Sequence, residues 1–95
     1  MTRINLNITR ETAEEIINIL ANEEYRGSYT DYDAEKDPNL ATEFIINGHT
    51  LSSISNQTNH VVIDGHYVNA SKTGIVIYKG QTMSNINWCL RKLGF

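Results

Sequence analysis

The chain has 95 residues and a mass of 10.8 kDa, which is enough for one small domain but not for two hydrophobic cores. Its composition, 40% hydrophobic and 20% charged with a single proline, is globular and excludes the disordered, collagenous and membrane-spanning classes. The formal net charge is −3, with nine acids and four bases in residues 1–40 and two acids and four bases in residues 41–95. This uneven distribution is not the broad basic surface of a nucleic-acid-binding domain.

The first elements along the chain are a strand and a helix. Residues 3–8 alternate between polar and apolar, which predicts a strand with one buried face carrying Ile4, Leu6 and Ile8. Thr9 then stands where a helix N-cap belongs, and the spacing predicts a helix over residues 10–26. Its apolar stripe contains Ala13, Ile16, Ile17 and Leu20.

The middle of the chain combines an acidic loop with β-hairpins. Residues 28–40 have no hydrophobic period and predict an exposed loop. Asn47-Gly48 and Asp64-Gly65 each separate two β-type runs, and such pairs favour two-residue turns with positive φ. Residues 74–79 predict a last strand that is apolar on both faces, and therefore central in the sheet or covered on both sides.

A second helix is predicted to close the chain, starting at Thr82 or Ser84 and ending at Gly94. Its apolar face would contain Met83, Ile86, Leu90 and Leu93. The sequence thus predicts a single α+β domain over residues 1–95 in the order β-α-β-β-β-β-β-α. We expect a mainly antiparallel sheet of five or six strands with two helices packed on it.

Motifs of catalysis are missing from the sequence, which contains no phosphate-binding loop, dinucleotide fingerprint, zinc-protease motif or nucleophile elbow. In the hairpin at Asp64-Gly65, the period of two would place His60 and His66 on opposite sides of the sheet, away from a common metal. The single cysteine, Cys89, excludes an internal disulfide and is interpreted as a packed thiol. We therefore predict a protein that is not an enzyme and that has neither a metal nor a cofactor.

Two features of the sequence suggest a binding surface. On a helical wheel, Trp88 lies nearly opposite the apolar face of the last helix, and Asn85 and Lys92 share its side. This tryptophan is either an exposed interface anchor or a side chain tucked against a strand end or the acidic loop. The second feature is a tyrosine–acid segment within the loop, which combines aromatic contact area with negative charge. Its members are Tyr29, Asp31, Tyr32, Asp33 and Glu35.

Some strands carry apolar residues on both faces, which indicates either helices on both sides of the sheet or burial of one face in an oligomer. Val76 with Tyr78, and Val62 with Tyr67, are expected on the face turned away from Ile4 and its neighbours. We therefore expect a homo-oligomer, a dimer or higher.

Small size, acidity, absence of catalytic motifs and a composition rich in Ile and Asn resemble those of the small accessory proteins carried by phages. This resemblance transfers no residues. It implies a cytoplasmic, non-enzymatic inhibitor that binds a host protein, such as a defence factor, stoichiometrically through the tyrosine–acid segment and Trp88.

The alternative is an oligomer that sequesters a nucleotide-type signalling molecule in a cleft between protomers. Trp88 would stack on the base, and Arg91, Lys92 or Lys72 would bind phosphate. No membrane partner is expected, and a nucleic-acid partner is the least favoured.

Overall fold

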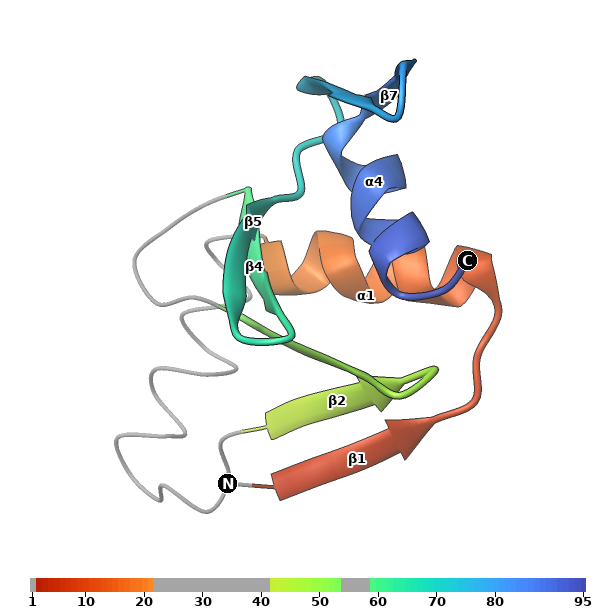
Figure 1. Cartoon of the computed structure of the whole chain (residues 1–95). Coiled ribbons are helices and arrows are strands. Elements are labelled where there is room, and N and C mark those ends of the chain that lie inside the picture. Colours follow the sequence, from red (N-terminus) through yellow and green to blue (C-terminus); the bar gives the residue numbers. More distant parts are fainter. Residues whose placement is uncertain (1, 22–41, 54–58) are drawn as a thin grey trace.

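The computed structural model describes residues 2–21, 42–53 and 59–95. Two helices pack against one side of a five-stranded sheet. A separate two-stranded ribbon stands at the N-terminal end of the second helix (Figure 1). The structure is therefore α+β, as the sequence predicts. Within the described residues, no helix is both long and apolar enough to cross a membrane.

The five-stranded sheet has the order β1-β2-β3-β4-β5. Its strands are β1 (Thr2–Leu6), β2 (Thr42–Ile46), β3 (His49–Ser53), β4 (His60–Ile63) and β5 (His66–Asn69). Only the β1–β2 pair is parallel, with Leu6 opposite Ile46, and the other neighbours are antiparallel. The sheet is therefore mixed but mainly antiparallel.

Both predicted hairpin turns are present in this sheet. Asn47 and Asp64 have φ values of 51° and 50°, and the glycines that follow them have values of 80° and 81°. Positive φ at both central positions matches the right-handed twist of the flanking strands, so each hairpin closes with only two residues. The register of the second hairpin, Ile63 opposite His66 and His60 opposite Asn69, confirms that His60 and His66 lie on opposite sides of the sheet.

Helix α1 spans Arg10–Ala21. The Thr12 N–H donates to Thr9 Oγ1 over 3.3 Å, which confirms Thr9 as its N-cap. The predicted continuation over residues 22–26 lies outside the described residues. Ala13, Ile17 and Leu20 are buried against the sheet, as their spacing indicates.

The ribbon consists of β6 (Ile75–Tyr78) and β7 (Gln81–Ser84), which are antiparallel. The interpretation of residues 74–79 as a central or covered strand is wrong, because β6 pairs only with β7 and leaves Ile75 and Ile77 exposed. Met83 lies in β7 and not on the helix. The sequence does not predict the turn between these strands, because Lys79 adopts a φ of 51°, a conformation that lysine rarely takes.

Helix α4 follows the ribbon directly and spans Asn85–Lys92. The Ser84 hydroxyl accepts a bond from the Asn87 N–H over 3.3 Å, so Ser84 is the N-cap. At the other end, Gly94 has a φ of 93°, and the Phe95 N–H donates to the Leu90 carbonyl over 2.9 Å. This is the Schellman arrangement, in which glycine ends a helix at low steric cost.

One core joins the sheet to both helices. Buried side chains from the sheet and from α4 meet there: Ile46, Leu51, Val61, Ile63, Ile86, Cys89 and Leu90. The opposite face of the sheet carries Val62 beside its register partner Tyr67, which is 69% exposed. The predicted companion pair, Val76 and Tyr78, is not on this sheet at all, because both residues belong to the ribbon.

Candidate functional site: a cationic–aromatic pocket

The outer face of α4 presents three chemically distinct side chains. Trp88, Arg91 and Lys92 are spaced i, i+3 and i+4, so they lie on neighbouring turns of one face. The inner face of the same helix is held in the core by Ile86, Cys89 and Leu90, three side chains that are at most 3% exposed. Because these buried side chains anchor the inner face, the outer face has a fixed orientation.

Tyr78, the last residue of β6, completes an aromatic pair with Trp88. The two ring centroids are 6.4 Å apart at an interplanar angle of 78°, an edge-to-face arrangement. Lys92 Nζ lies 5.1 Å from the centroid of the Trp88 ring, and Lys79 Nζ lies 5.4 Å from that of Tyr78. An ammonium group therefore stands within cation–π range of each ring.

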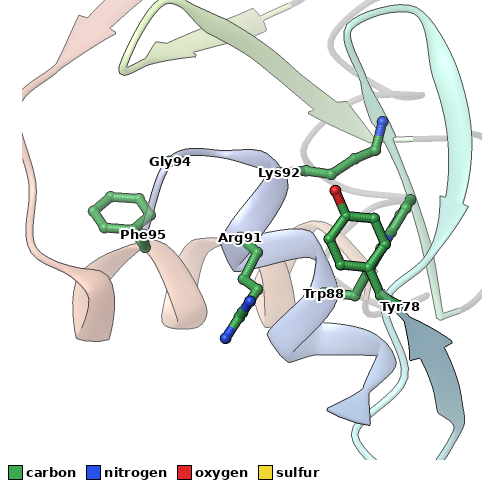
Figure 2. Close-up of a pocket in the computed structure, with 6 residues that line it drawn as sticks. All are labelled: Tyr78, Trp88, Arg91, Lys92, Gly94 and Phe95. Atoms are coloured by element: carbon green, nitrogen blue, oxygen red, sulfur yellow. The ribbon is translucent and has the colours of Figure 1, made fainter. Parts of the chain in front are cut away.

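These side chains line a pocket of about 410 Å³ (Figure 2). Its walls come from Tyr78, Trp88, Arg91, Lys92, Gly94 and Phe95. The volume falls within the ~300–1,000 Å³ of small-molecule sites. Two of the lining side chains, Arg91 and Lys92, are cationic.

A second, more polar pocket of about 340 Å³ shares Arg91 and Phe95 with the first. Its other lining residues include Arg10, whose guanidinium donates to Asn87 Oδ1 over 2.7 Å. In Figure 2 the Arg91 guanidinium points away from the Tyr78–Trp88 pair. Arg91 thus lines both an aromatic pocket and a polar one.

Three of the predicted ligand-binding residues come together in the aromatic pocket: Trp88, Arg91 and Lys92. Lys72 does not join them and lines a separate pocket beside α1, with Asn18 and Ala21. Trp88 is half-buried and packs against the core, with its ring at the end of β6, so it combines the two arrangements considered from sequence. The predicted partner-binding residues Tyr29, Asp31, Tyr32, Asp33 and Glu35 lie outside the described residues.

Tyr78 and Phe95 line the pocket but were not predicted to do so. Tyr78 was interpreted as part of a sheet face, because the Lys79-Gly80 turn was not identified. Because β6 reverses into β7 at this turn, Tyr78 lies beside Trp88 on the adjoining helix. Asn85, predicted beside Trp88, instead donates its side-chain amide to Ser71 Oγ over 3.1 Å.

The histidine with the clearest polar partner is His49, whose Nδ1 lies 2.8 Å from Asp64 Oδ2. The Thr50 N–H donates to Asp64 Oδ1 over 3.0 Å. This backbone bond, followed by the His49 contact, lowers the pKa of the Asp64 carboxyl below its ordinary value of 3.8. Because both partners belong to β3, this carboxylate ties the β4–β5 turn to β3.

Cys89 is fully buried, and its thiol lies 3.4 Å from the Asn69 carbonyl, to which it donates. Burial raises the pKa of this thiol to about 11, so it stays protonated at neutral pH and is a poor nucleophile. Across residues 2–21, 42–53 and 59–95, no three His, Cys, Asp or Glu side chains are grouped as metal ligands.

No protein-family model matches this chain, and no similar curated protein or solved structure was found. The functional proposal therefore depends on the chemistry of the pocket itself.

Proposed function

We propose that this protein is a non-enzymatic binding protein that takes a phosphate-bearing aromatic molecule of the nucleotide type in the pocket of α4 and β6. The observation that supports this most directly is the meeting of Trp88 and Tyr78 with Arg91 and Lys92 around one cavity. Aromatic rings bind a planar base by dispersion, and the cations bind phosphate through charge-assisted hydrogen bonds.

The position of Lys92 fits this role energetically. Its ammonium rests 5.1 Å from the Trp88 centroid, and a cation–π contact at an exposed site contributes about 0.5–1 kcal/mol. A hydrogen bond from an ammonium to a charged acceptor contributes about 1.5–3 kcal/mol. A phosphate would therefore draw Lys92 off the indole, and the ring face that it leaves would become available to the base.

Sequestration of such a ligand requires binding without turnover. The pocket fits that role, because the described residues that line it include no carboxylate side chain, histidine or cysteine as a general base or nucleophile. Inhibition of a host protein by a phage accessory protein stays a prediction, since five of its six proposed contact residues lie outside the described residues.

The test is calorimetric titration with adenosine monophosphate, guanosine monophosphate, adenosine and inorganic phosphate. We expect at least one nucleotide to bind, and its nucleoside and free phosphate to bind at least tenfold more weakly, because each fills only half of the site. Quenching of Trp88, the only tryptophan, provides a second signal.

Variants locate the binding in this pocket. Lys92→Ala should weaken nucleotide binding by about 10- to 100-fold, the equivalent of one charge-assisted hydrogen bond. The matched control is Lys72→Ala, which removes the same charge from a different pocket and should leave affinity unchanged. Equal effects of the two substitutions, or no binding of either nucleotide, would contradict the proposal.

A further inference from the structure

The outer edge of β6 is an apolar strand edge in the described structure. Ile75 and Ile77 are 70% and 73% exposed, the highest values among the large hydrophobic side chains that the structure describes. They lie on the ribbon face turned away from the pocket, since Tyr78, at the alternate position, contacts Trp88. In Figure 1 the ribbon stands clear of the five-stranded sheet.

The backbone of this edge is available for pairing. In a hairpin closed by two residues, the flanking pair Tyr78 and Gln81 exchange hydrogen bonds, and alternate residues follow. The bond from the Asn85 N–H to the Gly74 carbonyl, 2.9 Å long, continues this alternation. The N–H and C=O groups of Ile75 and Ile77 therefore point outward, and no hydrogen bond to them is seen from the described residues.

Proteins usually protect such an edge with a charge, a proline or a bulge. Ile75–Tyr78 contains no charged residue and no proline, and its four residues pair with β7 without a bulge. An unprotected, uncharged and apolar edge is suited to accept another strand.

We propose that a second copy of this chain covers the edge, with the two β6 strands antiparallel about a two-fold axis at Val76. Ile75 then lies opposite Ile77 of the second copy, and these pairs exchange the free backbone hydrogen bonds. Their four isoleucine side chains form one apolar cluster. The two-fold axis pairs the outward backbone groups of both β6 strands at once. No β6 edge is left for a third copy, so the assembly closes as a dimer.

The positions of the lysines and of the isoleucine cluster are compatible with a second copy in this register. Lys79 lies opposite Thr73 of the other chain, and Lys72 lies opposite Gly80, so no two lysines face each other. Because Tyr78 and Val76 occupy the opposite face of the ribbon, the isoleucine cluster forms away from the ligand pocket. This interface is independent of the proposed ligand.

Sedimentation velocity over a concentration series tests the dimer. We expect the wild type to dimerise and Ile77→Lys to sediment as a monomer, because each edge then carries a charge opposite an isoleucine. Ile19→Lys is the matched control, since Ile19 is also exposed, at 39%, but lies on α1. This control should dimerise like the wild type, and circular dichroism should show both variants folded.

Cross-linking tests the register without altering the isoleucines. Val76 would face its own copy across the axis as a non-hydrogen-bonded pair, with Cα atoms about 4.5 Å apart, a separation that allows a disulfide. Oxidised Val76→Cys should therefore migrate as a covalent dimer in a non-reducing gel. Thr82→Cys, exposed on the neighbouring strand, should not, and the buried Cys89 should not react.

A wild type that stays monomeric at every concentration overturns the proposal. So does a dimer that survives Ile77→Lys while Val76→Cys fails to cross-link, because the interface would then lie elsewhere. If Ile77→Lys does not fold, the cross-linking result decides alone.

Discussion

At the scale of single residues, side chains at the turns and helix ends connect elements that are distant in the chain. The Asn47 side-chain amide donates to the Leu93 carbonyl over 2.9 Å and so links the β2–β3 turn to the end of α4. Asp64 acts in the same way between the β4–β5 turn and β3. Each of these polar contacts fixes a loop without occupying the core.

The Asp64 carboxylate should make stability depend on pH. Since its pKa is lower in the folded chain than its ordinary value of 3.8, its contribution is fully present above pH 3.8 and is lost as the pH falls through the lowered value. The side chain is 40% exposed, so water screens the contact and we expect about 1 kcal/mol or less.

Asp64→Asn removes the charge while keeping a residue that tolerates the positive φ at this position. Urea unfolding at several pH values should show the wild type more stable than the variant at pH 6, with the difference shrinking below pH 4. A difference that is constant across this range would exclude the carboxylate as its source.

At the scale of elements, the junction between the ribbon and α4 positions the candidate site. The Gly74 N–H and the Asn85 side-chain amide both donate to Ser71 Oγ, over 3.0 and 3.1 Å. A Cβ on Gly74 would overlap the Asn85 amide, so glycine allows the strand to approach the helix this closely. This junction holds Tyr78 on β6 against Trp88 on α4.

Ser84 belongs to both elements, as the last residue of β7 and the N-cap of α4. Ser84→Ala removes the acceptor for the Asn87 N–H, and we expect a loss of about 0.5–1 kcal/mol in the free energy of unfolding. Thr82→Ala, an exposed substitution on the same strand, should change that free energy by less than about 0.5 kcal/mol. Similar losses in both variants would argue against the capping role.

At the scale of the whole molecule, the sheet and both helices share one core, so they should unfold together. Leu51 on β3 and Leu90 on α4 are both fully buried. Replacing either with alanine should cost about 2–5 kcal/mol, a large part of the ~5–15 kcal/mol that stabilises a domain of this kind.

Trp88 fluorescence and far-UV circular dichroism should report the same denaturation midpoint in the wild type and in both leucine variants. Ile19→Ala is the matched control, because Ile19 is 39% exposed and its truncation leaves no buried cavity. We expect it to cost less than either leucine variant. Separate midpoints for the two signals would show that α4 and the ribbon unfold independently of the sheet.

The local elements of this protein follow from the sequence alone. Period-two alternation identifies β1, although the strand ends at Leu6 and Ile4, predicted on its buried face, is 38% exposed. The i, i+3, i+4 spacing identifies α1 with its Thr9 cap. The Asn-Gly and Asp-Gly pairs place two hairpins with their register. Such features depend on steric contacts and hydrogen bonds between residues that are only a few positions apart in the sequence.

The site depends on contacts between elements, and these only the tertiary structure decided. Helical spacing predicted Lys92 beside Trp88, but Tyr78 joined them because β6 turns back through Lys79-Gly80 instead of entering the sheet. Lys72, equally basic, lies in another pocket because the segment after β5 lies beside the last turn of α1. Periodicity specifies which face of a strand is apolar, while packing determines whether a sheet, a helix or another molecule covers it.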